Sequence, residues 1–204
     1  AKIVLESLFP DKYKDLQIVD KPDLINNSLN YGIEVTSASS KWHKEAIKLW
    51  YMMPYVDDKR KEYYKKRMKQ LGVEYQGGIQ AWPPEFYLSD KIEETPLNRV
   101  LLAFEKKVKK LNGGHYCKLQ RYDIFIDSEV WLLEENIEKF LDEIILRNIG
   151  KLTYNFLYLT TSIDIYVFDL KNRKYDKILY SSFHNLQWEW ATKARDMVVE
   201  NEIS

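Results

Sequence analysis

Residues 21–36 read KPDLINNSLNYGIEVT, and this stretch decides the fold that we expect for the chain. It predicts two short strands, at 22–25 and 32–36, joined by a polar turn at 26–31. Asn, Ser and Gly tolerate the backbone angles of a tight turn, whereas the β-branched residues near the end of the stretch favour an extended strand. The sequence therefore predicts a β-hairpin here, and residues 17–19 are expected to begin its first strand.

The register of this hairpin brings two acids together. A turn centred between residues 28 and 29 places Asp23 opposite Glu34, and facing side chains on one face of such a pair lie roughly 4.5–5.5 Å apart at their Cβ atoms. Two carboxylates this close repel each other unless a proton or a cation lies between them. Because successive residues alternate faces, Thr36 joins Glu34 while Ile33 and Val35 point to a core. The pattern predicts a divalent-metal site built into the hairpin, with two solvated acids on an ordinary edge hairpin as the alternative.

The same residues carry a family resemblance. Pro22-Asp23, a short gap and then Glu34-Val35-Thr36 resemble the motif of the PD-(D/E)XK nuclease superfamily, and the helix-then-strand segment after residue 95 resembles predicted phage and mobile-element nucleases. The resemblance implies that Asp23 and Glu34, with the Val35 carbonyl, bind Mg²⁺ or Mn²⁺. In the superfamily a Lys two residues after the second acid helps to activate water. Thr36 stands at that position here, which departs from the motif.

The resemblance also implies candidates outside the hairpin. An acid from the helix before the first core strand often completes the metal site, and Glu6 is the acid in the expected helix 2–9. Some superfamily members carry the catalytic Lys on a neighbouring helix, and Lys41 and Lys44 lie on the helix expected after residue 40. Each of these three side chains has the alternative of a solvent-facing position on a helix.

Residues 57–70, DDKRKEYYKKRMKQ, are the strongest charge feature. Basic side chains neutralise phosphates and aromatic rings stack on unpaired bases, so the segment predicts contact with nucleic acid, with DNA favoured over RNA. A charged helix face in water would have the same composition. The candidate contacts are Lys59, Arg60, Lys61, Lys65, Lys66 and Arg67.

Composition limits the class of protein. The chain has 31 Lys and Arg against 31 Asp and Glu, so no net charge favours a nucleic-acid partner and only the distribution of charge can do so. Cys117 is the single cysteine, which excludes an internal disulfide framework and indicates a reducing compartment. No run of apolar residues is long enough to span a membrane and no signal-peptide pattern is present, so we expect a cytoplasmic protein without a membrane partner.

The order of expected elements predicts the fold class. Helix, hairpin, helix, insertion, helix, strand, helix, strands and helix give an α/β (α+β) fold with a mixed central sheet flanked by helices. The last three helices are expected from residue 96, at 136–148 and at 187–202. On the first of these the apolar face is expected to hold Val100, Phe104, Val108 and Leu111, with Lys106, Lys107, Lys109 and Lys110 largely off it. The resemblance implies a restriction-endonuclease-like core. We expect one domain over residues 1–204, with an inserted helical and loop segment at about 54–96.

Two functions from different classes remain open on the sequence. The first is a Mg²⁺-dependent phosphodiester hydrolase, in which a displaced Lys replaces the one missing at Thr36. The second is a non-catalytic module that binds nucleic acid or protein and retains a nuclease-like fold. The missing motif Lys and the zero net charge favour the second.

Overall fold

The computed structural model describes residues 1–71, 96–114, 116–128, 130, 132–161, 164–179, 186, 189–190 and 192–194. The chain divides into two units, one formed by Ala1–Ala38 with Val100–Ser204 and the other by Ser39–Arg99. The predicted insertion at about residues 54–96 falls within the second unit, and much of it lies outside the described residues.

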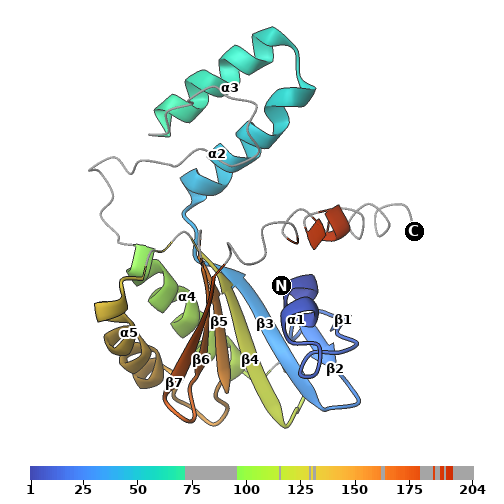
Figure 1. The fold of residues 1–204 in the computed structure, drawn as a ribbon, viewed down its shortest axis with the longest axis vertical. Helices are drawn as coiled ribbons and strands as arrows, with labels where there is room; N and C mark the ends of the chain where they lie inside the picture. The colour runs from blue at the N-terminus through green and yellow to red at the C-terminus, as the bar shows by residue number, and fades with distance from the viewer. Residues whose placement is uncertain are drawn as a thin grey trace. The chain divides into compact units, whose positions relative to one another are not determined.

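The first unit is built on a seven-stranded mixed sheet in the order β1-β2-β3-β4-β5-β6-β7 (Figure 1). The three strands at each end pair antiparallel, and β3, β4 and β5 pair parallel. The strands are β1 (Gln17–Ile18), β2 (Leu24–Asn26), β3 (Tyr31–Ser37), β4 (Arg121–Asp127), β5 (Phe156–Thr160), β6 (Asp164–Asp169) and β7 (Lys174–Leu179). The helices of both units are α1 (Lys2–Leu8), α2 (Lys41–Met52), the 3-10 helix η1 (Met53–Tyr55), α3 (Asp58–Gln70), α4 (Pro96–Leu111) and α5 (Glu134–Arg147). The mixed sheet with helices confirms the expected α/β class.

The predicted hairpin is formed by β2 and β3. Leu24 pairs with Ile33 and Asn26 with Tyr31, which is the register expected for a turn centred between residues 28 and 29. The Asn26 side chain closes this turn, because its Oδ1 accepts the Leu29 N–H at 2.8 Å. One expectation was wrong: residues 17–19 do not lengthen the first hairpin strand. They contribute a separate strand, β1, that pairs antiparallel with β2.

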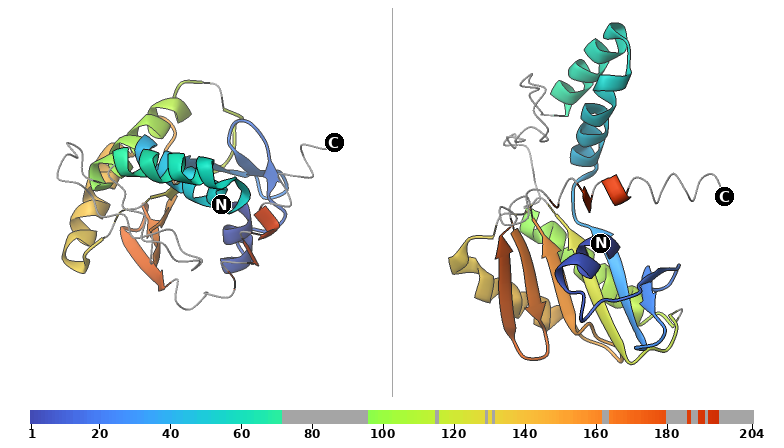
Figure 2. Two further views of the ribbon diagram at one scale, coloured as in Figure 1. Left: turned by 90° about the horizontal axis from the view of Figure 1, so that it is seen from above. Right: turned by 45° about the vertical axis from the view of Figure 1, so that its right-hand side comes forward.

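Helices cover the two faces of the sheet differently (Figure 2). Helix α1 lies on the face to which Ile33 points, and its Leu5 packs in one core cluster with Ile33 and Phe125. Helices α4 and α5 lie on the opposite face (Figure 1). Since side chains alternate along a strand, Glu34 and Ile124, which are register partners, point to the α4 face.

A buried polar network lies on the α1 face. Tyr13, Asp123 and Tyr158 are fully buried. The Tyr13 hydroxyl lies 2.6 Å from Asp123 Oδ2 and 2.6 Å from the Tyr158 hydroxyl, and Lys12 Nζ donates to Tyr158 at 2.6 Å. Arg121 adds an ion pair to Asp123 Oδ2 at 2.9 Å. Burial is the main cause of two opposite shifts: it lowers the pKa of Lys12 to about 8 and raises the pKa of the Asp123 carboxyl.

The second unit contains α2, η1 and α3. These elements share a small core of their own, to which α2 supplies Ala46, η1 supplies Met53 and α3 supplies Met68. Pro54 lies in η1, directly after the end of α2. The Asp57 side chain caps α3 by accepting the Arg60 N–H at 2.8 Å. The helix expected at 187–202 lies largely outside the described residues, although 189–190 and 192–194 are helical.

A search of the described helices for membrane spans finds none of sufficient length and apolar character.

Candidate active site at the Asp23–Glu34 hairpin

The hairpin brings Asp23 and Glu34 together on the α4 face of the sheet, as the sequence predicted. Continuing the β2–β3 register by one pair beyond Leu24 and Ile33 places Asp23 opposite Glu34. The two acids differ in exposure. The Glu34 side chain is 0% exposed, whereas that of Asp23 is 37% exposed. The pair is therefore a buried carboxylate with a second carboxylate at its solvent side.

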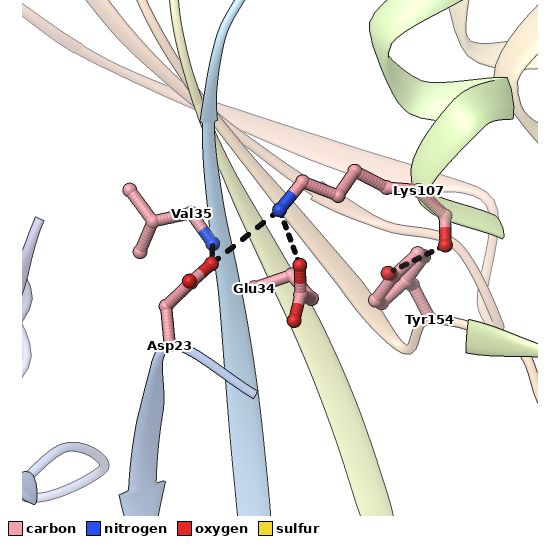
Figure 3. Close-up of polar contacts among 5 residues, drawn as sticks. All are labelled: Asp23, Glu34, Val35, Lys107 and Tyr154. Atoms are coloured by element: carbon pink, nitrogen blue, oxygen red, sulfur yellow. Dashed lines mark hydrogen bonds and ion pairs between the residues drawn. The ribbon is translucent and has the colours of Figure 1, made fainter. Parts of the chain in front are cut away.

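A lysine from α4 reaches both carboxylates (Figure 3). Lys107 Nζ donates to Glu34 Oε2 in a short contact and lies 3.5 Å from Asp23 Oδ2. Its side chain is 15% exposed, so this ammonium is largely withdrawn from water. Lys107 supplies the positive charge that two opposed carboxylates require.

Sequence reasoning missed Lys107, because it placed the lysines of this helix largely off the apolar face. That was wrong for Lys107. Val100, Phe104 and Leu111 are buried on α4, and Lys107 follows Phe104 by three positions and precedes Leu111 by four. Side chains three and four positions apart share a helix face, so Lys107 lies on the face that packs on the sheet. This spacing was the available signal.

The backbone of β3 fixes the position of Asp23. The Val35 N–H donates to Asp23 Oδ2 at 2.6 Å, as Figure 3 shows. Asp23 is therefore fixed against the β3 backbone beside Glu34, so the two predicted carboxylate ligands are neighbours.

Two tyrosines lie behind Glu34. The Tyr154 hydroxyl donates to the backbone carbonyl of Lys107 at 3.2 Å. Burial raises the pKa of both Tyr116 and Tyr154 far above the usual value, and the neighbouring Glu34 carboxylate adds to both shifts, in the case of Tyr116 also through a hydrogen bond. Glu34 Oε1 and the Tyr116 hydroxyl are buried, and neither has a further hydrogen-bond partner within the described part of the chain. The Tyr116 phenol is thus a polar neighbour of the Glu34 carboxylate, on which Lys107 already occupies Oε2.

The donor set fits a hard divalent cation. Carboxylate and carbonyl oxygens are the ligands that Mg²⁺ prefers, and Mg²⁺ usually keeps several waters, so a few protein donors suffice. Glu34 Oε1, which is buried and satisfied by no close hydrogen bond within the described part of the chain, is such a donor. Among the described residues no cluster of three or more His, Cys, Asp or Glu side chains could hold a metal, so an ion at this pair would rely on the two carboxylates together with water or backbone oxygen.

Of the other predicted site residues in the first unit, Glu6 is not brought to this pair. Glu6 belongs to α1, on the opposite face of the sheet, where its Oε1 accepts the Leu16 N–H at 2.9 Å and binds Lys2. The Glu6 carboxylate stabilises the loop after α1 and does not complete the Asp23–Glu34 site. Lys41 and Lys44 are exposed residues of α2 in the second unit, and their proposed catalytic role stays a prediction.

The basic segment forms α3, as expected, but part of its charge is already paired. Lys61 binds Asp58 at 3.1 Å, Lys65 binds Glu62 at 2.7 Å, and Arg67 forms a two-point contact with Glu45 at 2.7 and 3.1 Å. The remaining candidates of the segment are the exposed side chains of Lys59, Arg60 and Lys66.

Comparison with known proteins finds no match for the chain among protein-family models, curated protein sequences or solved structures.

Proposed function

We propose that the protein is a divalent-metal-dependent phosphodiester hydrolase that acts on nucleic acid, with its active site at Asp23, Glu34 and Lys107. The contact of Lys107 Nζ with both carboxylates carries the proposal. It places an acid pair and a lysine together, and α4 supplies the lysine that Thr36 does not. The mixed sheet that contains the hairpin is compatible with a restriction-endonuclease-like core, which forms part of the proposal.

Each residue has a distinct role in this proposal. Asp23 and Glu34, with the Val35 carbonyl, hold Mg²⁺ or Mn²⁺. The bound ion supplies Lewis-acid stabilisation of the phosphate and lowers the pKa of a bound water. Lys107 places a positive charge where negative charge develops on the phosphate, and the largely buried setting of that charge increases its effect.

The solvent side of the pair sets the direction of substrate approach. Glu34 is fully buried and Lys107 nearly so, whereas more than a third of the Asp23 side chain is exposed. A phosphate therefore reaches the site from the Asp23 side. DNA is the favoured substrate and RNA the alternative.

Cleavage of plasmid DNA, and of single-stranded DNA and RNA, in Mg²⁺ or Mn²⁺ tests the proposal. We expect nicking that a chelator abolishes and that Asp23→Asn and Lys107→Met each reduce at least about a hundredfold, the lower end of the effect of removing one charge-stabilising group. Lys106→Met removes an exposed charge from the adjacent position of α4 and should retain activity. Cleavage that survives both site substitutions would assign the activity elsewhere.

A second candidate function is a binding module that does not cleave. It is favoured by the complete burial of Glu34 against Lys107, since a buried ion pair can serve structure alone. Absence of cleavage on all three substrates, together with salt-sensitive binding, would support this function. Replacing Lys59, Arg60 and Lys66 with Glu should then weaken binding most at low salt, because each phosphate contact adds a counterion-release term.

A further inference from the structure

The Lys107 ammonium contacts the same two carboxylates that a bound metal ion would have to contact. It contacts Glu34 Oε2 and lies 3.5 Å from Asp23 Oδ2, so one positive group binds both carboxylates at once (Figure 3). These are the two acids to which a divalent-metal site has been assigned above. The same side chain that completes the site therefore also neutralises it.

We propose that Lys107 is a built-in competitor of the metal: a divalent cation binds Asp23 and Glu34 only as the Lys107 ammonium leaves them. This inference concerns the regulation of the site and rests on the proposed function for its biological meaning. The competition itself involves no nucleic acid and can be measured without it.

Burial prevents a divalent cation and the Lys107 ammonium from occupying the carboxylate pair at the same time. The carboxylate of Glu34 is 0% exposed and the Lys107 side chain 15% exposed, so little water screens a second cation from the ammonium. Like charges a few ångströms apart repel strongly when water is excluded. One oxygen of each carboxylate, Glu34 Oε2 and Asp23 Oδ2, is moreover already used by Lys107.

The surroundings allow the ammonium to leave without moving the carboxylates. The Lys107 backbone is held by the Tyr154 hydroxyl at 3.2 Å and by the buried neighbours Phe104 and Leu111 on α4. Asp23 is held separately by the Val35 N–H at 2.6 Å. The motion is therefore confined to the flexible methylene chain of Lys107, whose weaker contact is the one at 3.5 Å to Asp23.

Two consequences follow for the site. At low metal concentration the ammonium keeps the carboxylate pair neutralised and the site closed to cations. When a cation binds, the released ammonium has lost its anionic partners, and the phosphate of a nucleic acid is an anion that can replace them. Metal binding would thereby precede and favour engagement of the substrate phosphate by Lys107.

The test compares Mn²⁺ affinity, measured by isothermal titration without nucleic acid, in the wild type, Lys107→Met and Lys106→Met. We expect Lys107→Met to bind Mn²⁺ about tenfold more tightly or better, well within the usual range of coupling between two ligands. Lys106→Met removes one exposed charge and should change the affinity less than twofold. A crystal of the wild type soaked in Mn²⁺ should show Lys107 Nζ away from both carboxylates.

The soaked wild-type crystal keeps the proposal testable if Lys107→Met fails to fold. Unchanged or weaker Mn²⁺ affinity in Lys107→Met would overturn the competition, as would a bound ion beside an ammonium that still bridges Asp23 and Glu34. Failure of both proteins to bind millimolar Mn²⁺ would overturn it as well. Tighter binding by Lys107→Met in a protein that cleaves no nucleic acid would instead remove the proposed function and leave the competition in place.

Discussion

Removal of the Lys107 charge should destabilise the metal-free protein strongly. Lys107→Met keeps the length of the side chain but leaves the Glu34 carboxylate buried without a counter-ion. Breaking a buried ion pair from one side costs about 3–5 kcal/mol of unfolding free energy. Loss of the contact between Lys107 and Asp23 adds less than about 1 kcal/mol to this cost, because the Asp23 side chain is 37% exposed and its Oδ2 lies 3.5 Å from Lys107 Nζ.

A double-mutant cycle isolates the pair. Glu34→Gln should cost about 1.5–3 kcal/mol, since it removes a hydrogen bond between charged groups but leaves Asp23 to neutralise the lysine. The double variant Glu34→Gln, Lys107→Met should cost less than the sum of the two single variants, by at least about 1 kcal/mol. Urea unfolding followed by far-ultraviolet circular dichroism in the presence of a chelator gives these values if the slope m is unchanged.

An exposed lysine of the same helix provides the control for this cycle. Lys106→Met, at an exposed position, should lie within about 0.5 kcal/mol of the wild type. Additivity of the Glu34 and Lys107 substitutions to within about 0.5 kcal/mol would show that the two charges do not stabilise each other. The reasoning from burial would then be refuted.

Three further predictions concern residues outside the carboxylate pair. The pKa of Lys12 is lowered from 10.5 to about 8 in the folded protein, so between these pH values the unfolded chain binds more protons and the stability should rise with pH. Lys12→Met should remove this rise in the urea midpoint, whereas Lys14→Met, a substitution at an exposed lysine, should retain it. Tyr13→Phe deletes a fully buried hydroxyl with two polar neighbours at 2.6 Å and should cost about 1–3 kcal/mol in the same assay, with an unchanged stability contradicting the network. Gly32→Ala places a Cβ 2.3 Å from the Pro22 ring, so we expect a loss of about 1–3 kcal/mol by overpacking, and a melting temperature equal to the wild type would show that the ring moves aside.

The sequence by itself determined the hairpin and its register. The hairpin could be predicted because its register depends on the turn that joins the two strands, and that turn is local in the sequence. Once the turn is placed, the alternation of apolar side chains and the spacing of Asp23 and Glu34 follow from it. The helices at 2–8, 41–52, 96–111 and 134–147 were likewise indicated by their own periodicity and end signals.

The tertiary structure alone decided which groups from outside the hairpin reach the carboxylates. Glu6 was a candidate in the sequence, but α1 lies on the other face of the sheet, and its carboxylate binds the Leu16 N–H. Lys107 lies 73 positions from Glu34, and the two meet because α4, on the connection between the parallel strands β3 and β4, packs on the face to which Glu34 points. Periodicity shows which side of a helix is buried but not which strand residue that side will face, because this depends on how the helix packs across the sheet.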